Sequence, residues 1–191
     1  MPNRIYRAPL ALFVVAFSVV TIGAQSTAKE PPNPSGWSVF VSEEANFSAL
    51  FPGTPKASVV DVMTTPIKRQ KHWFEVIGPI YFAVCYSDHP LLPSFDVSSL
   101  EENYDFLRDK MVKTTKAELI RDEKVRVDSH SAREVTVRLG SSTAISRFLV
   151  VDRRLYQAIV SFKTDRENKK DTKEVITKFL NSFSIGAKRH V

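Results

Sequence analysis

The stretch AELIRDEKVRVDSHSAREVTVRLGSSTAISRFLVVDRRLYQAIVSF, residues 117–162, decides how this chain folds. It is rich in β-branched and aromatic residues, and its runs show the alternation that is typical of half-buried strands. These runs lie at 117–127, 132–139, 144–151 and 155–162. The segments between them are short enough for hairpins and too short for a crossover helix. The stretch therefore predicts an antiparallel meander.

Apolar stripes at helical spacing lie on both sides of this meander. The first consists of Leu100, Tyr104, Leu107 and Met111, and the second of Val175, Ile176, Phe179, Leu180 and Phe183. Thr164 and Glu167 have the spacing of a capping box, which makes them a candidate start for the second helix. Strand patterns also come earlier, at 47–51, 59–63, 71–77 and 80–86. We predict a single α+β domain at 37–185, in which an antiparallel sheet is packed with two main helices.

The N-terminus has the pattern of an export signal. Arg4 and Arg7 precede an apolar run at 10–20, and small residues follow it. We predict a signal peptide at 1–24, with cleavage after Ala24 or Ala28, and a periplasmic or extracellular location. An uncleaved membrane anchor is the alternative, although a spanning helix needs about 20 apolar residues. A proline-rich leader at 25–36 and a basic tail at 186–191 flank the domain.

Charge and cysteine content exclude several classes of protein. The 191 residues hold 27 Lys and Arg against 21 Asp and Glu, and no basic run of the kind that nucleic-acid-binding tails have. A nucleic-acid partner is therefore not expected. The single cysteine, Cys85, excludes an intrachain disulfide framework and a cysteine-built zinc site. Because Cys85 lies in an apolar strand pattern, we interpret it as buried and unreactive.

The sequence contains no recognisable reaction centre. His72, His89, His130 and His190 are not at metal-ligand spacing, and no glycine-rich phosphate loop or serine elbow is present. We therefore expect no cofactor, no metal and no enzymatic activity. A hydrolase or metal-dependent enzyme, with histidines brought to a cleft by the fold, stays open as an alternative.

Two surfaces are candidates for binding. Pro90, Leu91, Leu92, Pro93 and Phe95 make an apolar loop, which either folds back over a sheet edge or contacts a partner. Lys163, Arg166, Lys169, Lys170 and Lys173 make a basic surface, which is either a solvated helix face or a binder of anionic envelope material.

The order of the elements resembles that of exported proteins in the PsbP-like fold group. The resemblance rests on Phe51-Pro52-Gly53-Thr54-Pro55, on the aromatic strand at 81–86, on Arg147 to Val150 and Leu155 to Gln157 in the meander, and on Phe179 to Phe183. This group is similar in fold to the Ran-binding Mog protein, the extrinsic photosystem II subunit and small bacterial envelope proteins. The resemblance covers residues 37–185 and includes no catalytic signature.

The resemblance implies an α/β/α sandwich that serves as a binding or assembly module, often without activity of its own. Together with the export signal, it predicts an exported, non-enzymatic module of the cell envelope that contacts another protein. A membrane contact is expected only through an uncleaved signal segment. The alternatives are the enzyme with histidines at a cleft and the electrostatic binder of an anionic envelope surface.

Overall fold

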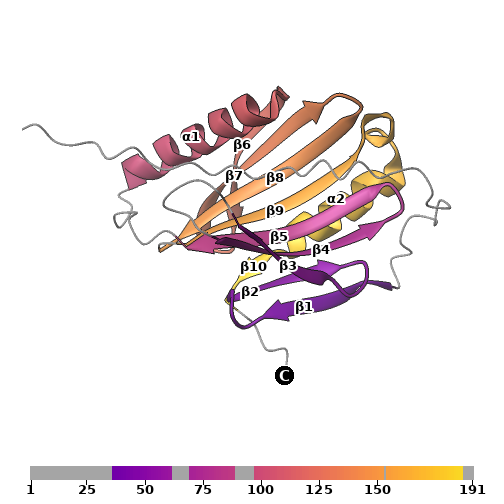
Figure 1. The fold of residues 1–191 in the computed structure, drawn as a ribbon, viewed down its shortest axis with the longest axis horizontal. Coiled ribbons are helices and arrows are strands. Elements are labelled where there is room, and N and C mark those ends of the chain that lie inside the picture. Colours follow the sequence, from indigo (N-terminus) through magenta and orange to yellow (C-terminus); the bar gives the residue numbers. More distant parts are fainter. Residues whose placement is uncertain (1–35, 62–68, 89–96, 153, 187–191) are drawn as a thin grey trace, which may run out of the picture.

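The computed structural model describes residues 36–61, 69–88, 97–152 and 154–186. Its strands form two antiparallel sheets (Figure 1). The smaller sheet has the order β1-β2-β10, and the larger one has the order β3-β4-β5-β9-β8-β7-β6. The strands are β1 (Ser38–Ser42), β2 (Phe47–Phe51), β3 (Lys56–Asp61), β4 (Arg69–Ile77), β5 (Ile80–Asp88), β6 (Glu118–Val127), β7 (His130–Leu139), β8 (Ser142–Val151), β9 (Arg154–Lys163) and β10 (Ser184–Ile185). The helical elements are α1 (Val97–Thr115), the 3-10 turn η2 (Thr164–Arg166) and α2 (Lys170–Ser182).

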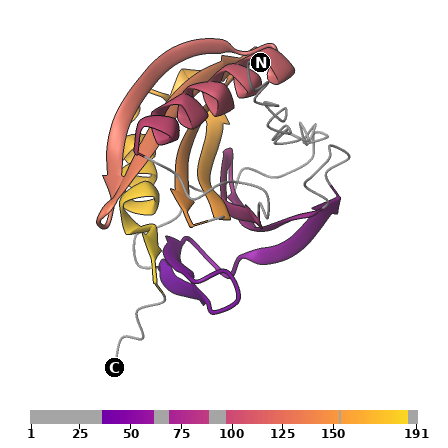
Figure 2. The ribbon, with the colours of Figure 1, turned by 90° about the vertical axis from the view of Figure 1, so that its left-hand side faces the viewer.

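The predicted meander is confirmed as β6-β7-β8-β9. Its hairpin turns contain residues with positive φ, namely Asp128 (52°), Gly140 (57°) and Asp152 (54°). Asp and Gly are among the residues that adopt this left-handed conformation most readily, so the polar separators suit tight turns. The large sheet curls strongly from β6 to β3 (Figure 2).

The large sheet carries a helix on each face. In β8, Phe148 packs with the residues of α1, whereas its neighbour Leu149 packs with those of α2. In β9, Leu155 packs with the residues of α1, and its neighbour Tyr156 packs with those of α2. Since successive side chains of a strand point to opposite faces, α1 and α2 lie on opposite sides of the sheet. The α+β class with two main helices is therefore confirmed.

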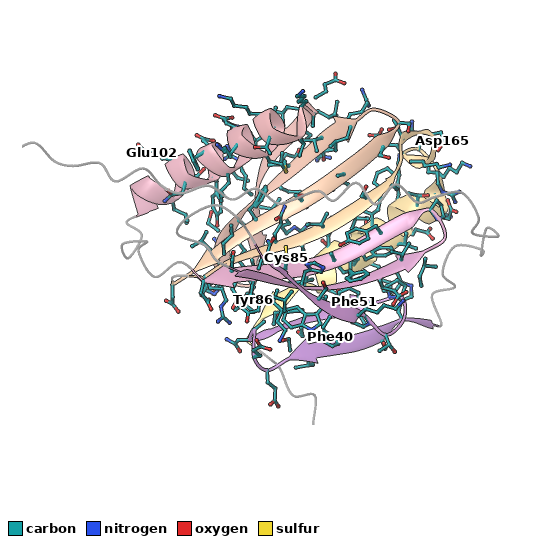
Figure 3. The ribbon with its side chains drawn as sticks, viewed as in Figure 1. Phe40, Phe51, Cys85, Tyr86, Glu102 and Asp165 are labelled. Atoms are coloured by element: carbon teal, nitrogen blue, oxygen red, sulfur yellow. The ribbon has the colours of Figure 1, made fainter. Side chains whose placement is uncertain are left out.

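The larger core lies between the small sheet, α2 and one face of the large sheet. Phe40 and Phe51 from the small sheet meet in an edge-to-face contact, with ring centroids 6.0 Å apart (Figure 3). Phe179 of α2 reaches Phe51 and Phe82, with both pairs of centroids 5.3 Å apart. Such aromatic pairs add to the stabilisation from buried area.

Two expectations need correction. A single sheet was predicted, but β1, β2 and β10 form a separate one because β10 pairs with β2 and not with the meander. The second helix begins at Lys170, and Thr164 opens only the turn η2, which has no side-chain cap. Val175, Ile176 and Phe179 pack in the hydrophobic core, and this packing, rather than the capping pattern, determines which residues are helical.

Candidate functional site

The apolar loop Pro90, Leu91, Leu92, Pro93 and Phe95 lies outside the described residues, as do His89 and His190. The predicted signal peptide, most of the leader and nearly all of the basic tail also lie outside them. None of the helices within the described ranges is long and apolar enough to cross a membrane.

The five residues of the basic surface do come together at one end of the molecule. Lys163 ends β9, Arg166 lies in η2, Lys169 precedes α2, and Lys170 and Lys173 lie in its first turn. The turn η2 is held against the β7–β8 hairpin, because the amide of Thr164 donates to the carbonyl of Ser141 (2.9 Å). The basic side chains are therefore carried on backbone that is fixed at both ends.

Acidic neighbours neutralise part of this basic surface. Arg166 Nη2 lies 3.3 Å from Asp171 Oδ2, and Lys170 Nζ lies 3.8 Å from Glu174 Oε1. Lys163, Lys169 and Lys173 are exposed and have no ion pair with another described residue. The positive end of the α2 dipole adds to their charge. The arrangement gives a diffuse cationic surface.

The described histidines are not brought together. His72 lies in β4, where it is half-buried and its ring centroid is 5.4 Å from that of Phe74. Burial lowers the pKa of His72, so the ring is neutral at physiological pH. His130 begins β7, and the order β4-β5-β9-β8-β7 separates the two strands by about 19 Å at the usual strand spacing. Across residues 36–61, 69–88, 97–152 and 154–186, no group of three or more His, Cys, Asp or Glu could hold a metal ion.

Cys85 is buried, as predicted, with 3% of its surface exposed. Its thiol lies 3.6 Å from the carbonyl oxygen of Gln157, whose side chain Nε2 donates to Ser146 Oγ (3.1 Å). Burial raises the pKa of Cys85 to about 12. Because the thiolate is the nucleophilic form, this cysteine is unreactive in the folded protein.

Sequence reasoning missed a stack of aromatic and cationic side chains formed by Lys71, Trp73, Tyr86, Arg154 and Tyr156, which we call the aromatic–cation stack. Lys71 Nζ lies 5.5 Å from the Trp73 ring centroid, and the Trp73 and Tyr86 rings are stacked 5.9 Å apart. The Arg154 guanidinium lies 4.3 Å from the centre of the Tyr86 ring and 5.9 Å from that of Tyr156. Figure 3 shows Tyr86 close to the region where the two sheets meet.

Polar contacts tie the aromatic–cation stack to the turn between β1 and β2. Glu44 accepts hydrogen bonds from Lys71 and from the Tyr86 hydroxyl, the latter over 2.9 Å. Arg154 makes a two-pronged contact with Asp88 at 2.5 and 3.0 Å and donates to the Glu44 carbonyl at 3.1 Å. The Tyr156 hydroxyl donates to the carbonyl of Ala45 (2.8 Å).

These contacts also set the protonation of the stack. The hydrogen bonds from Lys71 and Tyr86 lower the pKa of Glu44, so its carboxylate stays charged at neutral pH. Burial and the bond to Glu44 raise the pKa of Tyr86 to about 12, so its phenol stays neutral. The hydrogen bonds to Glu44 and Ala45 attach the aromatic–cation stack to the β1–β2 turn of the small sheet. Alternation places Lys71 and Trp73 on one face of a strand, and the short turn at Gly78-Pro79 predicts the hairpin that brings Tyr86 beside them. Only the pairing of β5 with β9 adds Arg154.

Comparison with known proteins bears on the fold. No family model and no curated protein matches this sequence. Among solved structures, it is similar to cyanobacterial PsbP (CyanoP) from Synechocystis, with a TM-score of 0.58 and 15% identity over 86% of this chain and 98% of that one. A protein of unknown function from Pseudomonas aeruginosa, PA94, described as a putative regulator, matches with a TM-score of 0.37 and 8% identity over 74% of this chain and 94% of that one. The likeness to CyanoP shows that this chain has a PsbP-like fold.

Proposed function

We propose that this protein is an exported, non-enzymatic binding or assembly module of the cell envelope, built as an α/β/α sandwich, that contacts another protein. The proposal rests on one observation: among the described residues, the polar and reactive side chains that could serve catalysis are buried, far apart or bonded to one another. Cys85 is buried and protonated, His72 and His130 lie on distant strands, and the aromatic–cation stack is engaged in internal contacts. The PsbP-like fold and the N-terminal signal pattern support the same function.

The apolar loop with Leu91 and Leu92 is the proposed contact with the partner protein. The test is capture of partners from an envelope extract by the full chain, followed by quantitative mass spectrometry. We expect Leu91→Asp combined with Leu92→Asp to remove a specific envelope protein from the captured set. Leu119→Asp is the matched control, because Leu119 is 42% exposed on the edge strand β6. Equal recovery of every protein with all variants would remove the loop from the proposal.

The enzyme alternative predicts a different set of sensitive residues. If histidines served a metal-dependent reaction, the purified chain would retain a stoichiometric metal ion, and His72→Gln or His130→Gln would release it. A binding module is expected to retain no such ion and to capture its partner equally well with both substitutions. Elemental analysis of the purified variants separates the two functions.

A second candidate function is electrostatic binding to an anionic envelope surface. The exposed side chains of Lys163, Lys169 and Lys173 favour it. In a sedimentation assay with anionic lipid vesicles, binding should be strong at low salt and disappear near 1 M salt, where the screening length falls to about 3 Å. We expect Lys169→Glu with Lys173→Glu to abolish binding, and Lys113→Glu in the last turn of α1 with Lys116→Glu just after that helix to preserve it. Binding that does not depend on salt would contradict this function.

A further inference from the structure

The outer edge of the small sheet is formed by β1, whose sequence is Ser38-Val39-Phe40-Val41-Ser42. Within the described part of the chain, β1 pairs only with β2, which leaves one of its edges open (Figure 1). Val39 and Val41 are 51% and 37% exposed. An open strand edge is a template for pairing with another strand, and monomeric proteins usually protect it.

Protection of this kind is present at the two edges of the large sheet and missing at β1. The edge strand β6 is rich in charged residues and has a register irregularity between Leu119 and Arg121. The edge strand β3 begins with Lys56 and ends with Asp61. In contrast, β1 has no charge and no proline, and its register with β2 is regular. Its edge therefore lacks the features that normally prevent pairing.

Hydrogen bonds in β2 show which groups of β1 face the open edge. The amide of Leu50 donates to Ser182 Oγ (2.8 Å), and the carbonyl of Asn46 accepts from the amide of Gly186 (2.9 Å). Ser182 and Gly186 flank β10, so these alternate residues of β2 face the side of β10. Phe40 lies opposite Ala49, whose backbone must therefore face β1. It follows that Phe40 bonds to β2, whereas the N–H and C=O groups of Val39 and Val41 point to the open edge.

The sequence SVFVS reads the same in both directions. If two copies of β1 pair antiparallel about a twofold axis at Phe40, Val39 of each copy lies opposite Val41 of the other. Both pairs are of the hydrogen-bonded type, so they exchange four backbone hydrogen bonds and satisfy all the outward groups of Val39 and Val41. The two Phe40 residues then form the closer, non-hydrogen-bonded pair. This closed, twofold arrangement is the commonest symmetry of protein dimers.

Charges at the ends of the strand are compatible with this register. Glu43 follows β1, and the twofold register places it opposite Trp37 of the other copy. Lys178 Nζ lies 5.0 Å from the Trp37 ring centroid, so an acidic group of one copy approaches a basic group of the other. Glu43 and Glu44 of one copy do not face those of the other, which avoids like-charge repulsion across the contact.

We propose that β1 is a homodimerisation edge, through which two copies of this chain pair in antiparallel register about Phe40 and join their small sheets into one. The contact is small, because a five-residue strand buries less surface than a standard interface. We therefore expect a dissociation constant of about 0.1–1 mM. This pairing goes beyond the proposed contact with another envelope protein and uses different residues.

Sedimentation velocity of the full chain at increasing concentration tests the pairing. We expect a dimer to accumulate as the concentration approaches about 1 mM. Val41→Lys should weaken association by at least about tenfold, because it places two positive charges within the paired strands. Val59→Lys is the matched control, since Val59 is 55% exposed on the edge strand β3. A chain that stays monomeric, or one whose association responds equally to both substitutions, would overturn the proposal.

A thiol cross-linking experiment tests the register without relying on a loss of binding. Val39→Cys and Val41→Cys chains are mixed and treated with a short bifunctional thiol reagent, while Cys85 stays protected by burial. Because Val39 is predicted to face Val41 of the other copy, the mixture should cross-link several-fold more than either variant alone. Cross-linking of either single variant to the same extent as the mixture would contradict the twofold register. Pairing of the β1 edge with a strand of another protein, while the chain itself stays monomeric, would also overturn the proposal.

Discussion

Arg147 connects the large sheet to the C-terminal end of α2. Its guanidinium donates to the carbonyl of Leu180 (2.6 Å) and to the carboxylate of Glu134 at 2.6 and 3.0 Å. Only 9% of Arg147 is exposed. The residue satisfies a carbonyl at the helix end, where no further helical amide is available. Arg147 therefore attaches the end of α2 to β8, in addition to forming an ion pair with Glu134.

Replacing Arg147 with methionine keeps much of the side-chain volume and removes the charge. The Glu134 carboxylate and the Leu180 carbonyl then stay largely buried without their partner. We expect the free energy of unfolding to fall by about 2–4 kcal/mol, measured by urea denaturation. Arg121→Met is the control, because Arg121 pairs with Glu123 on the exposed surface, and this change should not be measurable. Equal effects of the two substitutions would show that Arg147 does not support α2.

The buried thiol of Cys85 gives a second prediction at the level of a single residue. Because burial raises its pKa to about 12, almost no thiolate is present at pH 8. Iodoacetamide should leave Cys85 unmodified in the native protein and modify it fully in guanidinium chloride, as measured by intact mass. Rapid modification of the native protein would show that the strand β5 opens readily around this residue.

At the level of elements, β10 is held by a carboxylate from the β6–β7 turn in addition to its pairing with β2. Asp128, in the β6–β7 turn, accepts hydrogen bonds from the Ser184 hydroxyl and from the amide of Ile185 at 2.9 and 2.8 Å. The strand itself has only two residues. This contact therefore attaches β10 to the β6–β7 turn and adds to the short pairing with β2.

Asp128→Gly removes the acceptor and tolerates the positive φ of this position. We expect hydrogen exchange at the Ile185 amide to accelerate at least about tenfold, with a much smaller change in the core amides of β8 and β9. Asp152→Gly is the matched control, because Asp152 has the same left-handed conformation in the β8–β9 turn. If the control accelerates exchange in β10 to the same extent, the effect comes from turn flexibility and not from the lost contact.

The helix α1 is attached to the sheet edge by a network of ion pairs. Arg133 joins Glu101 and Asp105 of α1 to Asp122 of β6, and Arg108 of α1 also reaches Asp122 (2.6 Å). Burial raises the pKa of Asp122, but the hydrogen bonds from Arg108 and Arg133 outweigh it, and the pKa is lowered from 3.8. The folded state therefore binds the proton of Asp122 more weakly than the unfolded state does.

This difference predicts how stability depends on pH. A group with a lowered pKa in the folded state contributes stability above its unfolded pKa, and this contribution is lost as the pH falls through the folded value. Urea midpoints measured from pH 6 to pH 2 should therefore fall below pH 4. Asp122→Asn should be less stable than the native sequence at pH 6 and should show a smaller fall. Parallel pH profiles for the two proteins would exclude Asp122 as a source of this acid sensitivity.

For the whole molecule, local patterns predicted the meander and both helices, because alternation and helical spacing are properties of neighbouring residues. The stripe of Leu100, Tyr104, Leu107 and Met111 does pack on the sheet, with Leu100 only partly buried. The pairing of β5 with β9 could not be predicted in this way, since it joins residues as distant as Asp88 and Arg154. The same holds for the aromatic–cation stack, which exists only once these strands are neighbours.

Of the small sheet, β2 was predicted at 47–51, but β1 was missed for a different reason. The pattern Val39-Phe40-Val41 is short and follows directly on a proline-rich segment, so it carries little local signal. Its role as a strand depends on Phe40 packing against Phe47 and Trp73, which come from two other strands. Tertiary contacts of this kind outweigh weak local preferences.

The β5–β9 pairing has a consequence for when the chain can acquire its structure. A ribosome releases the residues of β5 long before those of β9, and the two central strands of the large sheet cannot join until the later one has emerged. Closing so long a loop is slow compared with forming a hairpin. The hairpins β4-β5 and β6-β7-β8 can therefore form early, whereas the large sheet becomes continuous only after β9 has been synthesised.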